Sequence, residues 1–187
     1  MKKDDGNSDR NAIIEAATRF KDGDAEAFEF LYNRFKNMIY RLCLKILGDE
    51  EIAKDCFQET FLKAYDHRMD IKPETFHNWL YTIAHNTCIN HIRKQKRQVK
   101  IGNNDYGFRP QSYLNIGIKE AINEKIQLLP VILREALILR DYEDLTYESI
   151  AEILKIDKNT ALVRVHRARL KLKELLAPLV KELNESN

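Results

Sequence analysis

The stretch LTYESIAEILKIDKNTALVRVHRARLKL, residues 145–172, decides the fold, because its cap residues predict two short helices joined by a tight turn. Thr146 can cap the first helix through its hydroxyl, and apolar residues then recur at helical spacing. Asp157 stands where a second N-cap is needed, so a new helix is expected from Lys158. This pattern is typical of a helix-turn-helix.

The second of these helices has two different faces. At about 100° per residue, one face packs and the opposite face is presented to a partner. The basic residues have no acid among them, which favours a helix lying in a DNA groove lined by phosphates. The alternative is a solvated basic helix in an α-helical bundle. The packing residues are Ala161, Val165, Ala168 and Leu172, the presented ones are Asn159, Val163, His166 and Arg167, and the basic ones are Arg164, Arg167, Arg169, Lys171 and Lys173.

The composition indicates a folded chain without a dominant charge. Of its 187 residues 44% are hydrophobic, and the net charge is only +2, so any basic surface must arise from clustering. Glycine and proline are scarce and apolar residues recur at three and four, which predicts an all-α protein. The polar start MKKDDGNSDRN is neither a secretory signal nor an anchor, and no apolar run approaches membrane-spanning length. A soluble, cytoplasmic protein without direct membrane insertion is expected.

Neither a metal site nor a catalytic motif is indicated. His85, Cys88 and His91 invite a metal, but their spacing along a helix spreads the outer two about 120° apart, and no fourth ligand is in sight. No histidine is paired with a Ser or Cys nucleophile in a recognisable motif, and no Gly-rich phosphate loop occurs. We therefore expect no metal, no cofactor and no enzymatic activity. Three cysteines inside helical patterns, Cys43, Cys56 and Cys88, are typical of buried side chains in a reducing compartment.

Four helices are predicted before the linker, and cap residues mark the ends of the first three. A short one spans residues 13–21 and ends at Gly23, Asp24 caps a long one that stops at Gly48, and Asp49 caps the next. This next helix has an inward apolar face and an opposite, mostly polar stripe, which by periodicity alone is typical of solvated surface. The inward residues are Ala53, Phe57, Phe61 and Ala64, and the stripe is Asp55, Gln58, Glu59 and Leu62.

Pro73 and Thr75 mark the start of the fourth helix, which opens FHNWLYTIAHN at Phe76. Beside its core face runs a stripe with an aromatic ring, two amides and two arginines, the groups needed to stack a base, read its edge and hold the backbone. The alternative is a core tryptophan followed by a charged helix end. The stripe is Trp79, Asn86, Asn90, Arg93 and Arg97, and the basic cluster after it is Arg93, Lys94, Lys96, Arg97 and Lys100.

Periodicity fails from residue 100 to residue 114, where glycine, asparagine and proline accumulate as in a linker. Beyond it, isoleucines recur every four residues from Ile118 to Ile126, and Pro130 can start another helix. We therefore predict two small helical domains joined by a flexible linker, with the helix-turn-helix in the second. The domains are residues 1–99 and 116–187, and the linker is residues 100–115.

Two motif blocks in this order and separation resemble bacterial RNA polymerase sigma factors of the extracytoplasmic-function (ECF) group in the sigma-70 family. They are GDEEIAKDCFQETFLKAY, from Gly48, and LPVILREALILRDYEDLTYESIAEIL, from Leu129, and F-x-x-W-L-Y-x-I-A-x-N, from Phe76, adds to the likeness. The resemblance implies a promoter-recognition subunit that directs core RNA polymerase to specific promoters and helps to initiate transcription. It also implies an anti-sigma factor as a further partner.

The resemblance assigns a role to each predicted surface. The first domain (region 2) would dock on the β′ clamp of the polymerase and capture the melted −10 element as single strand. The second (region 4) would contact the β flap and read the −35 element as duplex. The polymerase-binding residues are then Asp55, Gln58, Glu59 and Leu62, the −10 residues Trp79, Asn86, Asn90, Arg93 and Arg97, and the −35 residues Asn159, Thr160, Leu162, Val163, His166 and Arg167.

The chain departs from the family pattern at several positions. Lys155 stands at the turn where glycine is usual, and Ser149 stands where an acid often completes the capping box. Leu162 and Val163 replace a lysine and a serine of the common recognition sequence, and the loop 70–74 lacks the common Arg-Gly pattern. Two other hypotheses are an independent dimeric helix-turn-helix regulator and a metal- or redox-responsive protein using His85, Cys88 and His91.

Overall fold

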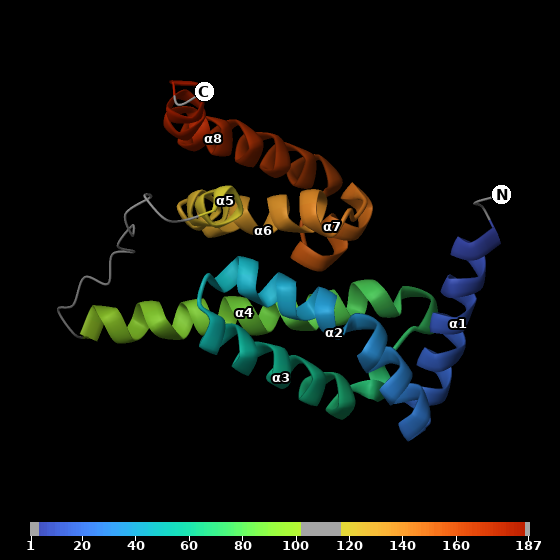
Figure 1. The fold of residues 1–187 in the computed structure, drawn as a ribbon. Coiled ribbons are helices and arrows are strands. Elements are labelled where there is room, and N and C mark those ends of the chain that lie inside the picture. The colour runs from blue at the N-terminus through green and yellow to red at the C-terminus, as the bar shows by residue number, and fades with distance from the viewer. Residues whose placement is uncertain (1–3, 102–116, 186–187) are drawn as a thin grey trace.

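The computed structural model describes residues 4–101 and 117–185, and these two ranges fold into helices linked by short turns (Figure 1). The predicted linker lies outside the described residues except for Lys100 and Ile101, which continue the preceding helix. The N-terminal unit contains α1 (Asp4–Lys21), α2 (Ala25–Leu47), α3 (Glu50–Asp66) and α4 (Phe76–Ile101), with single 3₁₀ turns at Arg68–Asp70 and Pro73–Thr75.

Capping residues set the ends of these helices where the sequence predicts them. The carboxylate of Asp24 accepts hydrogen bonds from the backbone N–H groups of Glu26 and Ala27 at 2.9 and 3.1 Å, which satisfies two unpaired donors of α2. Asp49 caps α3 in the same way, and Gly48 ends α2 with a left-handed φ of 73°. The predicted start of α1 is wrong, because the helix begins at Asp4, nine residues before Ile13.

The apolar stripes predicted on these helices form the core of the N-terminal unit. Ala53, Phe61 and Ala64 of α3 are buried as expected, while Phe57 is half-buried among neighbouring aromatic rings. Aromatic side chains from four helices, including Phe20, Phe35 and Phe76, fill the space between them. This packing fixes the rotation of α3 and α4, and so decides which of their residues face outward.

The C-terminal unit contains the predicted helix-turn-helix, which is confirmed. Thr146 caps α7 by accepting the backbone N–H of Ser149 at 3.2 Å, and Asp157 caps α8 by accepting that of Thr160 at 2.8 Å. Lys155 takes the left-handed turn, with φ 53°, that glycine would adopt more easily. The elements are α5 (Ile118–Gln127), α6 (Val131–Leu137) with a π-helical turn (Ile138–Tyr142), α7 (Tyr147–Leu154) and α8 (Lys158–Glu185).

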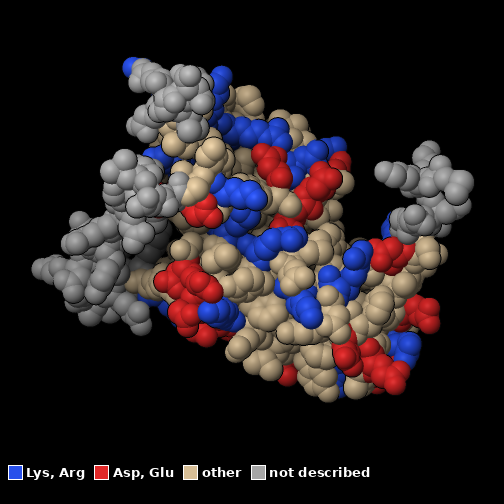
Figure 2. All heavy atoms as spheres, in the orientation of Figure 1, with Lys and Arg blue, Asp and Glu red and all other residues tan. Residues whose placement is uncertain are grey.

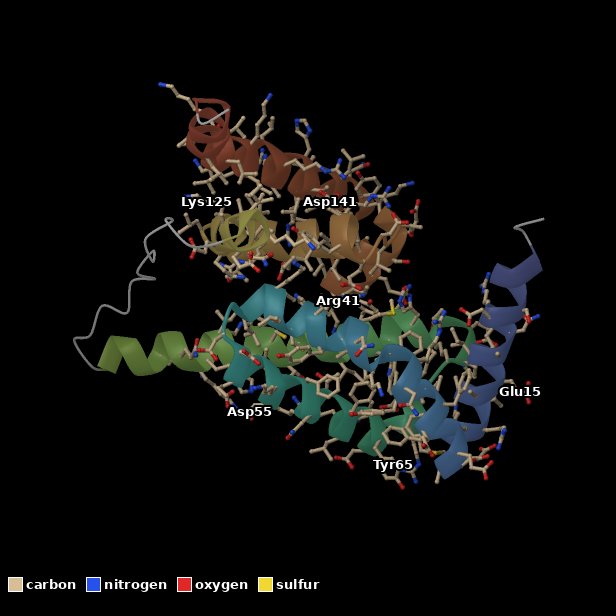
Figure 3. All side chains as sticks on the ribbon, viewed as in Figure 1. Glu15, Arg41, Asp55, Tyr65, Lys125 and Asp141 are labelled. Atoms are coloured by element: carbon tan, nitrogen blue, oxygen red, sulfur yellow. The ribbon has the colours of Figure 1, made fainter. Side chains whose placement is uncertain are left out.

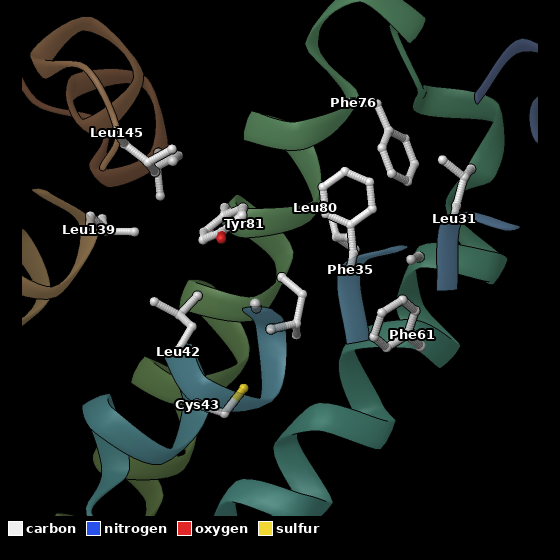
Figure 4. Packing of buried hydrophobic residues seen from close by; sticks show 14 of the residues in the cluster. Leu31, Phe35, Leu42, Cys43, Phe61, Phe76, Leu80, Tyr81, Leu139 and Leu145 are labelled. Atoms are coloured by element: carbon white, nitrogen blue, oxygen red, sulfur yellow. The ribbon is translucent and has the colours of Figure 1, made fainter. Parts of the chain in front are cut away.

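The two units lie directly against each other. Helix α7 packs beside α4, and α5 and α6 pack beside α2 (Figure 1). Figure 4 shows Tyr81 of α4 directed at Leu139 and Leu145 of the C-terminal unit, and all three belong to one continuous apolar cluster. The sequence predicts the two units but contains no local signal for this contact, because its residues come from separate helices.

Candidate nucleic-acid and polymerase interfaces

Helix α8 presents one of its faces to solvent. Ala161, Val165 and Ala168 are completely buried against the rest of the unit. The opposite face is therefore directed outward, and five of the predicted −35 residues are exposed there: Asn159, Leu162, Val163, His166 and Arg167. The sixth, Thr160, is half-buried and donates its hydroxyl to the Asp157 carboxylate, so its polar group is engaged in capping.

Acids from other helices partly neutralise the basic residues of α8. Arg164 reaches Glu135 of α6 at 3.3 Å, and Arg169 pairs with Asp141 of the π-helical turn. Figure 2 shows acidic side chains interspersed with lysines and arginines over this unit. The sequence missed this neutralisation because the acids lie far from α8 along the chain. For Arg167, no acid partner exists within the described ranges, so it remains available for a phosphate or a base.

The predicted −10 stripe on α4 is open along most of its length. Asn86, Asn90, Arg93 and Arg97 are exposed. Trp79 is half-buried, packs against the core and lies 5.6 Å from Phe76 between ring centroids. The indole therefore supports the core on one side and can offer an aromatic surface on the other, so the two interpretations of Trp79 are compatible.

The predicted polymerase stripe on α3 mixes acid, amide and apolar groups. Asp55 and Gln58 are exposed, and Leu62 is 67% exposed. Glu59 is held in place by Lys63 at 2.7 Å and by His91 of α4 at 3.0 Å. The hydrogen bond from Lys63 contributes most, and that from His91 adds to it, so the pKa of Glu59 is lowered below its ordinary value.

Two exposed apolar residues extend this stripe beyond the predicted set. Tyr65 is 46% exposed and Met69 is 63% exposed, and they follow Leu62 at intervals of three and four. Figure 3 shows Asp55 and Tyr65 along α3, on the side away from the C-terminal unit. Tyr65 also packs on Phe28, with ring centroids 5.7 Å apart, and Met69 lies in the 3₁₀ turn after α3. The helical periodicity of α3 alone therefore did not reveal them.

Comparison with known proteins identifies the two units. Residues 31–98 match Sigma-70 region 2, and residues 119–172 match Sigma-70, region 4. The RNA polymerase sigma-H factor of Pseudomonas aeruginosa is 31% identical over 180 residues, which cover 88% of this chain and 93% of that protein. The ECF RNA polymerase sigma factor SigW of Bacillus subtilis is 33% identical over 184 residues, with coverages of 89% and 98%. The chain belongs to the ECF sigma factors of the sigma-70 family.

Solved structures agree with this sigma factor in fold. The sigma factor RpoE in complex with the anti-sigma factor NepR, from Bartonella quintana, is 24% identical with a TM-score of 0.67, and covers 82% of this chain and 98% of its own. CnrH in complex with the cytosolic domain of CnrY is 21% identical with a TM-score of 0.69, and covers 89% and 98%. These structures agree with the predicted all-α fold, and the matches to regions 2 and 4 confirm its two sigma domains. The same matches, with the sigma-factor relatives, confirm the function of a promoter-recognition sigma factor.

The three residues considered as a metal site in this sigma factor face different partners. His85 Nε2 lies 2.9 Å from Glu135 of α6, whereas His91 Nε2 lies 3.0 Å from Glu59 of α3. Cys88 is buried beside Cys43 and Cys56, and contact with these thiols, together with burial, raises its pKa. In the ranges that the structure describes, His, Cys, Asp and Glu do not form a group of three or more placed to hold a metal ion.

A third face of α4 meets the C-terminal unit, and the sequence did not reveal it. The Tyr81 hydroxyl donates to Glu143 Oε2 at 2.7 Å, and the Asn78 amide donates to Glu152 of α7 at 2.6 Å. Tyr81 and Asn86 are five residues apart, so at about 100° per residue they lie about 140° apart around α4. Region 4 therefore covers a different side of α4 from the −10 stripe.

None of the described helices has the length and apolar character to cross a lipid bilayer.

Proposed function

We propose that α8 reads the −35 element in the major groove, that the stripe on α4 binds the melted −10 strand, and that the stripe on α3 docks on the β′ clamp of core RNA polymerase. The observation that carries this proposal is the group of exposed residues on α8, within the segment matched to region 4. Asn159, His166 and Arg167 offer hydrogen bonds to base edges or phosphates. Leu162 and Val163 offer apolar contact with thymine methyl groups.

Exposure and chemistry support the assignment of the −10 element to α4. Asn86 and Asn90 project one turn apart, and each amide can pair with a base edge once the base has left the duplex. Trp79 adds a stacking surface, and Arg93 and Arg97 add charge near the backbone of the strand. The single-stranded form suits these groups, because inside a duplex the face of each base is stacked on its neighbours and is closed to an aromatic side chain.

The surface on α3 supports docking to polymerase. Leu62, Tyr65 and Met69 expose apolar area beside the polar groups of Asp55 and Gln58. A mixture of this kind, an apolar centre with a polar edge, is typical of a protein interface rather than of a nucleic-acid one. Region 4 would reach the β flap through a separate surface.

The chain would act without catalysis of its own, in the cytoplasm, where core polymerase and promoter DNA are found. An anti-sigma factor is a further proposed partner. It is supported by the two solved relatives, which are in complex with the anti-sigma factor NepR and with CnrY.

A transcription assay tests the proposal. Core polymerase and the chain are mixed with a pool of linear templates whose −35 and −10 elements are randomised, and the run-off transcripts are sequenced. We expect transcripts from a defined subset of templates only when both proteins are present. The Asn86→Ala variant should lose preference at the −10 element and keep that at the −35 element. If the chain adds no transcript to those made by core polymerase alone, the proposal is wrong.

A further inference from the structure

The contact between the two units of this sigma factor buries four polar side chains. The Tyr81 hydroxyl donates to Glu143 Oε2 at 2.7 Å, and His85 Nε2 lies 2.9 Å from Glu135 Oε2. All four side chains are at most 8% exposed. Burying a carboxylate is costly unless it is paired. Glu135 is also paired with Arg164 of its own unit at 3.3 Å, and both acids meet a partner on α4. The two pairs therefore specify one way for the units to fit together.

The C-terminal end of α2 completes the fit. The last carbonyls of a helix have no partner inside it. Here the Gln127 side chain donates to the Lys45 carbonyl at 2.7 Å, and the Arg134 guanidinium donates to the Ile46 carbonyl at 2.8 Å. The Lys45 ammonium lies 3.8 Å from the centroid of the Tyr142 ring. Region 4 thus caps a helix of region 2, which a chance contact between two tethered domains would not do.

Two buried polar atoms at the contact between the units lack a hydrogen bond to the part of the chain that the structure describes. Glu143 Oε1 and His85 Nδ1 are buried and have no protein hydrogen-bond partner among the described residues. Both atoms would gain hydrogen bonds to water if the units separated, which offsets part of the cost of opening. The contact therefore favours one relative orientation of the two units, and these two polar atoms lower the cost of separating them.

The packed chain cannot read both promoter elements at once. Elements about 25 base pairs apart are separated by about 85 Å along B-DNA, at about 3.4 Å per base pair. Helix α4 has 26 residues. It is therefore about 39 Å long at about 1.5 Å per residue, and region 4 lies directly on its side. The −10 stripe and the exposed face of α8 are each open, but they are too close together to span a promoter.

We propose that the pairs Tyr81–Glu143 and His85–Glu135 form a latch that holds the free chain closed, and that the latch must release before regions 2 and 4 engage the two promoter elements. This proposal rests on the proposed function, because the distance argument needs both elements to be read by one chain. Core polymerase, by holding the two regions on separate surfaces, supplies the energy of opening. The occupant of the buried face of α4 in the free protein is the chain's own region 4.

The first test measures the distance between the units. Cysteines are introduced at the exposed positions Asp66 of α3 and Lys173 of α8 and labelled for single-molecule energy transfer. The three native cysteines are fully buried and should stay unlabelled. With the four latch residues unchanged, the distance between the two labels should be short in the free chain and long when core polymerase is bound. A long distance in the free chain would overturn the proposal.

A charge reversal then opens the latch. The charges of Arg41 and Lys45 act on Glu143, and Tyr81 donates to it. Glu143→Lys therefore buries a third positive charge near those two, and should shift the ratio of closed to open chains by about a hundredfold toward open. Glu174→Lys, on the exposed surface of α8, is the matched control and should change nothing. Tyr81→Phe keeps the ring and removes only the donor, and should give a smaller shift in the same direction. Unchanged distances in both latch variants would contradict the proposal.

The second test locks the chain shut. Asn78→Cys and Glu152→Cys, at a contact between α4 and α7, are joined with a short bis-maleimide, and the product is compared with the same variant capped by N-ethylmaleimide. The cross-linked chain should lose run-off transcription at least about tenfold relative to the capped one, because the open form is no longer populated. Equal transcription from both would overturn the latch. Failure of the capped and wild-type chains alike would instead count against the proposed function.

Discussion

Helices α8 and α4 are both proposed to bind DNA, yet they pack differently in the protein. Helix α8 has two faces, one completely buried at Ala161, Val165 and Ala168 and one exposed. Helix α4 has three, since it packs in the core of region 2, carries the −10 stripe and receives region 4 through Tyr81 and His85. When a helix has one packing surface, its sequence predicts which face is buried. When it has two packing surfaces, the sequence of the helix alone does not.

The largest expected effect separates the two faces of α8. Ala161→Arg should destabilise region 4 by at least about 3 kcal/mol, because it forces a charged side chain into a filled core. Leu162→Arg, at the next residue, is the control and should stay within about 0.5 kcal/mol, since that side chain is 46% exposed. Thermal unfolding monitored by circular dichroism measures both. Similar losses in the two variants would show that the helix is rotated from its described position.

The next prediction compares two asparagines that lie on different faces of α4, Asn86 and Asn78. Asn86→Ala should weaken use of the −10 element by about 1 to 3 kcal/mol, because an amide that pairs with a base edge is lost. Its affinity for core polymerase should not change, as Asn86 lies off the docking stripe. Asn78→Ala removes the contact to Glu152 and should leave recognition of the −10 element intact.

Open-complex yield and equilibrium binding to core polymerase distinguish these outcomes. If Asn86→Ala lowers polymerase affinity as much as it lowers promoter opening, the residue is structural. If Asn78→Ala alters −10 preference, the stripe is wider than the faces of α4 suggest.

A smaller effect is expected from the exposed apolar pair on α8. Replacing Leu162 by Lys and Val163 by Ser restores the common family residues and should change −35 preference by about 1 to 3 kcal/mol per altered base contact. The melting temperature should hardly move, because both side chains are more than two-fifths exposed. Selection from a library of −35 sequences measures the preference. A strong fall in melting temperature with promoter choice unchanged would place these residues in the core.

The smallest effect is the dependence of stability on pH, and it differs between the inner and outer acids. Burial raises the pKa of Glu143 above its ordinary value of 4.5, so its contribution to the packed form is present at low pH and is lost as the pH rises through the raised pKa. The pKa of Glu59 is lowered by Lys63 and His91, so its contribution is present above 4.5 and is lost as the pH falls through the lowered pKa.

Carbon-detected NMR of the two carboxyl groups should show Glu143 titrating above Glu59. Tyr81→Phe should alter the titration of Glu143 and leave that of Glu59 unchanged. If Glu143 titrates at its ordinary value while the pKa of Glu59 stays lowered, the units are separated in solution.

Local chemistry predicted the caps Asp24, Asp49, Thr146 and Asp157, because a cap depends only on residues within one turn. It also predicted the exposed face of α8. It left two interpretations of Trp79 open, core or exposed stripe, and it could not predict that Arg164 and Arg169 are neutralised or that Tyr81 meets Glu143. Those contacts join residues 29, 28 or 62 positions apart, or depend on the packing of several helices.

The central claim is that the two DNA-reading helices act together only when core polymerase holds them apart. The most direct measurement is a gel shift of the purified chain on duplex promoter DNA at physiological salt, with and without core polymerase. We predict weak, salt-sensitive and nearly non-specific binding by the chain alone, because unstacking a base costs a few kcal/mol and one helix-turn-helix offers a single groove contact. Specific binding should appear when core polymerase is added. Tight, sequence-specific binding of the chain alone to a palindromic site would contradict the account.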